Sequence, residues 1–309
     1  MQCINPLKAS FTKDGTVTFS KKQADISIQP FEFPCRKCLA CRLNQAREKS
    51  IRAIHEAQSF GHNNIFLTLT YSDEHLESDK LIYYDFQAFM KRLRYQYPDQ
   101  KISYMVTGEY GDKTKRPHWH ALLFNFRPED EQYKYSTDRG DKVYDSKIIT
   151  DTWSKGISEY GEVNLDSAGY VARYAAKKLT HGSDNEHDFH PIHRTSCKHA
   201  LGRKWIEKNY RFVLENGFIN LPNGEQAKIP RYYLDWAKSH VPDLYETYVT
   251  QTRKELIKTA EKKKRQDEIE HFNNICSWKR GATYPMTRPK VRETILKSKF
   301  KQLQERLKL

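Results

Sequence analysis

The chain of 309 residues has no long hydrophobic run. No apolar stretch approaches the roughly 18 residues that a membrane-spanning helix needs. Residues 1–6 lack the basic and then apolar order of a secretory signal. We also find no internal repeat and no glycine-rich loop of the kind that cradles phosphates in nucleotide-driven motors. These absences predict a soluble intracellular protein that has no membrane partner and is not a helicase.

Acidic residues are outnumbered by basic ones. The chain has 39 Asp and Glu against 53 Lys and Arg, which gives a formal net charge of +14. A surface of this charge attracts a polyanion, either nucleic acid or an anionic membrane. The 19 tyrosines offer stacking surfaces for unpaired bases, although part of the aromatic content must pack in the core. A nucleic-acid partner is therefore the first expectation.

Three of the six cysteines stand close together, at Cys35, Cys38 and Cys41, and Cys3 lies near the start of the chain. In a reducing compartment, clustered cysteines bind metal more often than they form disulfides. Three thiolates spaced by two residues, with Cys3 as the fourth ligand, predict a structural Zn²⁺ site. The alternative is a cysteine-rich helix start that is buried in the core.

Residue periodicity predicts an α+β fold. β-branched and aromatic runs predict strands at residues 17–20, 65–71, 101–109, 116–126 and 156–165. A period of 3.6 predicts helices at residues 35–60, 83–97, 146–153 and 169–179, the last capped by Asp166 or Ser167. The polar stretches 127–145 and 180–204 are predicted to be loops. A strand pair is expected around residues 218–224, and charged helix from residue 244 onward.

These patterns divide the chain into four segments. Residues 1–60 form an N-terminal cysteine-rich segment and helix, and residues 61–182 form the core domain. Residues 183–250 are an accessory segment, and residues 251–309 are a basic helical tail.

Two histidines stand one residue apart in the predicted strand 116–126. His118 and His120 share a face of the strand, and Trp119 points to the other face. The preceding strand ends at Glu109, and a hairpin places that carboxylate across from His118. One carboxylate and two imidazoles with open positions suit Mg²⁺ or Mn²⁺ acting on phosphate. The alternative is two half-exposed strand histidines and a surface glutamate paired with a neighbouring lysine.

The predicted helix 169–179 carries Tyr170 and Tyr174, four residues apart on one face, and Lys177 three residues further on. A tyrosine hydroxyl becomes a nucleophile when a cation lowers its pKa or a metal polarises its target. Attack on a DNA phosphodiester forms a phosphotyrosine link and frees a 3′-hydroxyl, and the reverse reaction is ligation. The alternative is an ordinary packed stripe of aromatic residues.

The ordered motifs resemble the rolling-circle replication initiators of the HUH endonuclease superfamily, and among them the gokushovirus initiators with two tyrosines. The resemblance rests on the cysteine motif 35–42, on residues 108–111 and 116–120, and on residues 170–177, and it runs from Cys3 to about Tyr210. It implies that residues 61–182 are an HUH core, a ferredoxin- or RRM-like antiparallel sheet of four or five strands. The two histidines then lie on the central strand, beside the tyrosine helix.

The resemblance also implies an activity. Tyr170 and Tyr174 are the expected nucleophiles, and Tyr174 with Lys177 matches the Tyr-x-x-Lys form, whereas Arg173 stands at the lysine position that follows Tyr170. The expected reaction nicks the viral-strand origin of a single-stranded DNA phage and rejoins the ends. The expected partners are single-stranded and origin DNA of the virus, a host helicase and a DNA polymerase, in the cytoplasm of the bacterial host.

Two other functions remain open. A non-catalytic zinc-containing DNA-binding protein would use the cysteines and the basic tail and leave the histidines structural. A plasmid-type mobilisation relaxase usually has a third histidine in its metal set, and Glu109 in that place argues against it.

Overall fold

A computed structural model describes residues 3–76, 78, 80–111, 115–177, 192–196, 200–276, 286 and 288–307. The chain divides into two compact units. The core unit is Ala46–Tyr248, and the second unit combines Met1–Gln45 with Val249–Leu309. The α+β class is confirmed, with a large antiparallel sheet flanked by helices, a cysteine-rich N-terminal part and a helical C-terminal part. The four-segment division of the chain stays a prediction.

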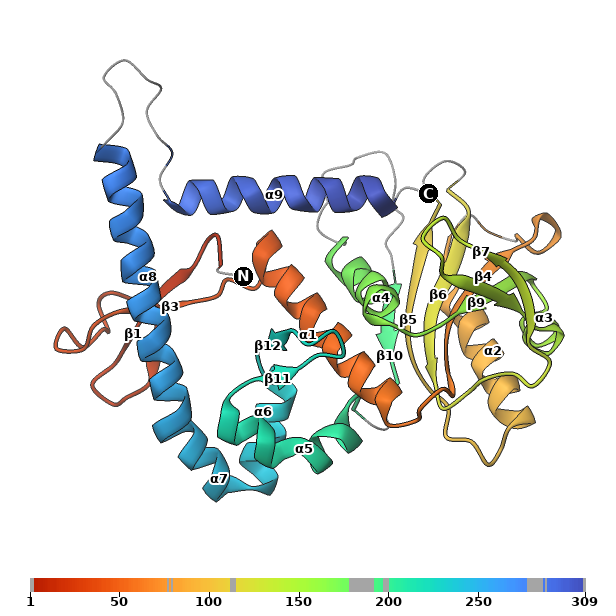
Figure 1. Ribbon diagram of the computed structural model, residues 1–309, viewed down its shortest axis with the longest axis horizontal. Coiled ribbons are helices and arrows are strands. Elements are labelled where there is room, and N and C mark those ends of the chain that lie inside the picture. Colours follow the sequence, from red (N-terminus) through yellow and green to blue (C-terminus); the bar gives the residue numbers. More distant parts are fainter. Residues whose placement is uncertain are drawn as a thin grey trace, which may run out of the picture. The chain divides into compact units, whose positions relative to one another are not determined.

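The core unit is built on a sheet that has seven strands within the described residues (Figure 1). Their order is β10-β5-β6-β4-β9-β8-β7, and neighbouring strands are antiparallel. Strand β6, which carries the two histidines, lies between β5 and β4. The strand bounds are β4 Asn64–Tyr71, β5 Ser103–Tyr110, β6 Pro117–Phe124, β7 Gln132–Ser136, β8 Lys142–Asp145, β9 Gly156–Gly161 and β10 Ile192–Thr195.

Both faces of this sheet are covered, because side chains alternate along β6. Trp119 and Leu123 belong to a core with helices α2 and α3, and Leu122 and Phe124 belong to a core with α1 and α4. All four side chains are fully buried, and each such burial contributes about 1.5–3 kcal/mol. The helix bounds are α1 Leu39–Gln58, α2 Tyr83–Gln96, α3 Lys147–Trp153 and α4 Leu165–Lys177. The sheet is therefore held rigidly where the histidines leave it.

The predicted loop at residues 127–145 is wrong, because this stretch contains the hairpin β7–β8 at the edge of the sheet. Every residue of β7 is exposed, so the sequence shows no alternation of apolar and polar residues. The hairpin is held by cross-strand pairs such as Tyr133 with Tyr144, and by the pairing of Tyr144 with Tyr160 on β9. Gly140, with φ of +83°, supplies the turn.

The predicted loop at residues 180–204 is also wrong where it can be compared. Ile192–Thr195 forms strand β10 along the edge of β5, and helix α5, Arg203–Asn216, begins inside the stretch. Pairing with β5, a contact distant in sequence, turns a short polar segment into a strand. Residues 180–191 and 197–199 lie outside the described residues.

Helix α4 begins at Leu165, four residues earlier than predicted, and its N-cap is Asn164 rather than Asp166 or Ser167. The Asn164 Oδ1 accepts from the backbone N–H of Ser167 at 2.8 Å, and the Ser167 hydroxyl oxygen accepts from the N–H of Asn164 at 2.9 Å. This reciprocal capping pair fixes the start of the helix that carries Tyr170.

The expected strand pair near residue 220 and the expected charged C-terminal helices are confirmed. The remaining elements of the core unit are β11 Ile219–Asn220, β12 Gln226–Ala227, α6 Arg231–His240 and α7 Pro242–Thr247. The second unit contains β1 Leu7–Phe11, β2 Val17–Thr18, β3 Phe31–Phe33, α8 Arg253–Cys276 and α9 Arg288–Leu307. Among the described helices, none is long and apolar enough to cross a bilayer.

Candidate functional site

Strand register brings the predicted metal ligands together. Glu109 on β5 lies directly opposite His118 on β6, and Thr107 lies opposite His120. On the other side of β6, Thr68 of β4 lies opposite His120. Directly paired residues share a face of an antiparallel sheet. The expected hairpin juxtaposition of Glu109 and His118 is therefore present.

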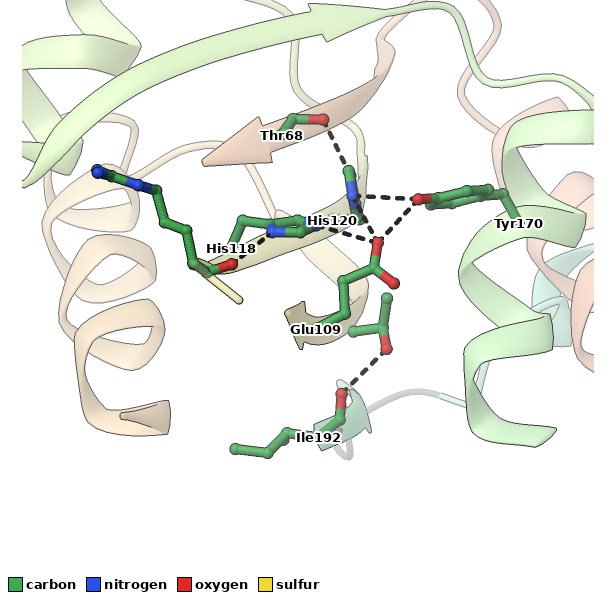
Figure 2. Close-up of polar contacts among 8 residues, drawn as sticks. Thr68, Glu109, His118, His120, Tyr170 and Ile192 are labelled. Atoms are coloured by element: carbon green, nitrogen blue, oxygen red, sulfur yellow. Dashed lines mark hydrogen bonds and ion pairs between the residues drawn. The ribbon is translucent and has the colours of Figure 1, made fainter. Parts of the chain in front are cut away.

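Glu109, His118 and His120 form a compact group, here called the Glu-His-His triad (Figure 2). The Nε2 atoms of His118 and His120 lie 3.2 Å and 2.8 Å from the Glu109 Oε1. One donor atom from each residue falls within 4.8 Å of the others. The glutamate side chain is only 5% exposed, and the imidazoles are 18% and 12% exposed. The triad is thus a nearly enclosed set of one oxygen and two nitrogen donors.

Neighbouring groups orient both imidazole rings. The Nδ1 of His118 lies 3.1 Å from the backbone carbonyl oxygen of Arg116, which can only accept a hydrogen bond. The Nδ1 of His120 lies 3.0 Å from the Thr68 hydroxyl. A proton on each Nδ1 leaves the Nε2 lone pairs directed at the centre of the triad. This is the arrangement that metal-binding histidines usually have.

The triad keeps its carboxylate charged. Burial raises the pKa of Glu109, but hydrogen bonds from His118 and His120 and the charges of the two rings lower it to about 2. Within the described part of the chain, the buried Oε2 of Glu109 has no hydrogen-bond partner. An ionised, buried carboxylate oxygen without a donor fits a cation, because leaving such an atom unsatisfied is costly. The donor set therefore fits a divalent metal of the Mg²⁺ or Mn²⁺ kind.

A glycine in β5 supports the floor beneath the triad. A Cβ on Gly108 would lie 2.5 Å from Cζ3 of Trp119, so the buried indole occupies the space of the missing side chain. The Trp119 Nε1 donates to the Tyr71 hydroxyl at 3.1 Å, and that hydroxyl donates to Asp85 at 2.9 Å. Sequence analysis assigned no role to Gly108 or Thr68. A glycine inside a predicted strand signals a close approach of this kind.

Tyr170 reaches the triad from helix α4 (Figure 2). Its hydroxyl donates to the Glu109 Oε1 at 2.8 Å and lies 3.4 Å from the His120 Nε2. Its ring meets the ring of His120 edge to face, with centroids 5.0 Å apart, and contacts Phe66. One of the two predicted nucleophiles therefore lies against the predicted metal ligands.

The other two predicted catalytic residues lie further along the same helix. Helix α4 continues to Lys177, so the backbone places Tyr174 one turn beyond Tyr170. The side chains of Tyr174 and Lys177 lie outside the described residues.

The structure also brings the four predicted zinc ligands together in the second unit. One sulfur atom from each of Cys3, Cys35, Cys38 and Cys41 lies within 4.8 Å of the others. None of these four cysteines is in a disulfide.

Comparison with known proteins gives a family. The model of the replication-associated protein family that is named for ORF2 matches residues 64–179, the stretch from β4 to α4 that contains the triad and Tyr170. No solved structure gives a significant match.

Three viral proteins are similar to this chain. The replication-associated protein VP4 of Bdellovibrio phage phiMH2K is 52% identical over all of both chains. ORF2 of Spiroplasma virus 4 is 28% identical over 84% of this chain and 87% of its own length. ORF4 of Chlamydia phage 1 is 33% identical over 74% of this chain and 59% of its own length. These last two are also described as replication-associated proteins. The chain therefore belongs to the family of microvirus replication-associated proteins.

Proposed function

We propose that this protein initiates rolling-circle replication as a metal-dependent, single-strand-specific DNA endonuclease of the HUH type. It nicks the viral-strand origin through a tyrosine–DNA 5′-phosphate intermediate and rejoins the ends to close a circle. One observation carries the proposal. The Tyr170 hydroxyl lies 2.8 Å from Glu109 and 3.4 Å from His120, so a nucleophile and a metal donor set share one site.

The triad would hold Mg²⁺ or Mn²⁺ through the Glu109 carboxylate and the Nε2 atoms of His118 and His120. Three protein donors leave coordination positions open for phosphate oxygens and water. The bound ion supplies Lewis-acid polarisation of the scissile phosphate. The protein contributes rigid placement, since all three side chains stand on paired strands whose opposite face is packed against α2 and α3.

The chemical step balances without an oxidant or reductant. The Tyr170 phenolic oxygen forms a bond to phosphorus and loses its proton, and the bond from phosphorus to the 3′ oxygen breaks. The released 3′ oxygen takes up a proton. One phosphodiester replaces another, so attack by a 3′-hydroxyl on the phosphotyrosine reverses the step and joins DNA ends.

Helix α4 supplies the residues for a second nick. Tyr174 follows Tyr170 by one turn, and Lys177 completes the Tyr-x-x-Lys pattern. In an alternating scheme, one tyrosine holds the 5′ end while the other cuts the regenerated origin. The freed 3′-hydroxyl is the primer for a host DNA polymerase, and a host helicase opens the duplex ahead of it. The reaction takes place in the cytoplasm of the bacterial host.

Trapping of the covalent intermediate tests the proposal. Protein is incubated with Mn²⁺ or Mg²⁺ and labelled single-stranded circular DNA carrying the viral origin, and adducts that survive denaturant are counted on a gel. We expect an adduct with wild type and with the control Tyr133→Phe, whose ring is 59% exposed on the β7–β8 hairpin. The double variant Tyr170→Phe/Tyr174→Phe should form none, and neither should His118→Ala/His120→Ala.

Both double variants should keep salt-sensitive DNA binding, because phosphate contacts by Lys and Arg supply most of that affinity. An adduct in the double tyrosine variant would reject the assignment of the nucleophiles. Tight DNA binding by wild type without any adduct, in either metal, would reject the enzyme and favour the non-catalytic zinc-containing DNA-binding protein.

A further inference from the structure

The N-terminal segment, residues 3–38, has almost no hydrophobic core. Within it, only Ala9 and Thr18 are buried, whereas Phe19 and Ile26 are 64% and 99% exposed. The small sheet β2-β1-β3 leaves most of its aromatic rings in partial contact with solvent. Segments of this size usually need a metal, a disulfide or a partner to hold one conformation.

The four cysteines supply such a crosslink. The Sγ of Cys3 lies 3.5 Å from the Sγ of Cys35 and 3.8 Å from the Sγ of Cys38, and Cys41 completes the set within 4.8 Å. A tetrahedron of sulfur atoms around one ion, with bonds of about 2.3 Å, has edges of about 3.8 Å. A disulfide needs about 2.0 Å between its sulfur atoms, so the spacing fits one shared ion instead.

Backbone N–H groups surround these sulfur atoms. The N–H groups of Ile4, Cys35 and Cys38 point at the Sγ atoms of Cys38, Cys3 and Cys35, at 3.5, 3.3 and 3.3 Å. Donors directed at sulfur stabilise thiolates, the form that binds metal. Arg36, with φ of +58°, turns the chain between Cys35 and Cys38 so that both sulfur atoms face the same point.

The fourth sulfur lies in the first turn of α1, since Cys41 is the third residue of that helix. The unpaired N–H groups at a helix N-terminus favour a negatively charged thiolate there. Cys41 is also the most buried of the four, at 4% exposed. The site is therefore closed on its helix side.

We propose that Cys3, Cys35, Cys38 and Cys41 bind one Zn²⁺ in a closed tetrahedral site, and that this ion holds the fold of residues 3–41. Four protein ligands leave no position for substrate, so the ion is structural. Thiolates select zinc over Mg²⁺ and Mn²⁺, which distinguishes this site from the Glu-His-His triad. The ion ties residue 3 to residue 35, across a sequence separation of 32, and both to the start of α1.

Elemental analysis of the full chain, purified under reducing conditions, tests the proposal. We expect one zinc per wild-type chain and none in Cys35→Ser/Cys38→Ser. The matched control is Cys197→Ser/Cys276→Ser, which changes the two cysteines outside the cluster and should retain one zinc. Equal zinc in the two double variants would overturn the assignment, and so would iron in place of zinc.

Cobalt substitution gives a measurement that does not depend on a variant folding. Wild type reconstituted with Co²⁺ should show a thiolate-to-cobalt charge-transfer band and the visible bands of a tetrahedral site. The same bands should persist in His118→Ala/His120→Ala, which lacks the other candidate metal site. Absence of thiolate bands in wild type would overturn the proposal. The proposal would also fail if residues 1–41 of the wild-type chain resisted protease equally with zinc and after chelation.

Discussion

The substitution Gly108→Ala should damage the fold and the candidate metal site together. The added Cβ would lie 2.5 Å from Cζ3 and 2.8 Å from Cε3 of Trp119, where carbon atoms need about 3.5 Å or more. The indole cannot retreat, because it is fully buried and its Nε1 donates to Tyr71. Strand β5 must therefore shift by about 1 Å, at a cost of about 1–3 kcal/mol for overpacking.

That shift carries Glu109, the next residue, away from His118 and His120. Binding sites tolerate misplacement of only about 0.5 Å, so we expect Mn²⁺ affinity to fall at least about 10-fold. The unfolding temperature should fall by about 2–10 °C, at 2–4 °C per kcal/mol for a unit of this size. Titration of free Mn²⁺ by electron paramagnetic resonance measures the affinity, and circular dichroism during heating measures the unfolding temperature.

The matched control is Gly161→Ala on β9, in the same sheet. Its Cβ would lie 3.2 Å from the carbonyl oxygen of Lys142, a contact that a movement of a few tenths of an ångström relieves. We expect the control to be milder in unfolding temperature and unchanged in Mn²⁺ affinity. If Gly108→Ala matched wild type in both measurements, the close approach of Trp119 would not be what sets the position of β5.

Three further predictions concern the triad and the tyrosines. In chelator, the ionised Glu109 should stabilise the fold above its ordinary pKa of 4.5 and lose about 3 kcal/mol as pH falls toward the folded pKa of about 2. Urea unfolding at several pH values measures this slope, which Glu109→Gln should lack. Thr68→Val removes the hydroxyl at Nδ1 of His120 and should weaken Mn²⁺ binding about 10-fold; an unchanged affinity in calorimetry would show that the contact does not orient the ring. Tyr174→Phe should still nick origin DNA once, because Tyr170 is at the triad, but both single variants should fail to release circles over repeated turnovers. Circle yield at the wild-type rate from either would contradict the alternating scheme.

Local patterns in the sequence were enough to predict the centre of the molecule. The strands at residues 65–71, 101–109 and 116–126 alternate or are β-branched, and the structure has β4, β5 and β6 there. Because side chains alternate strictly along a strand, His118 and His120 had to share a face. The short connection at residues 110–115 made a hairpin, and the hairpin placed Glu109 beside His118.

Capping and edge strands could not be predicted with the same success. Asp166 and Ser167 are as good N-cap residues as Asn164 in general, and only the packing of α4 decides where the helix begins. Strand β10 and the β7–β8 hairpin have little burial of their own. Each is a strand because a neighbour in the sheet supplies backbone hydrogen bonds, which a local reading of polar residues does not contain.

The sequence by itself determined which residues could form the candidate site, since residue type sets the donor atoms and strand periodicity sets their face. Only the tertiary structure decided that Tyr170 reaches that site, because its position depends on how α4 packs against the sheet. The same holds for Thr68 and Gly108, whose roles arise from partners about 50 and 11 residues away in sequence. Contacts between residues distant in sequence follow from packing, and no local pattern encodes them.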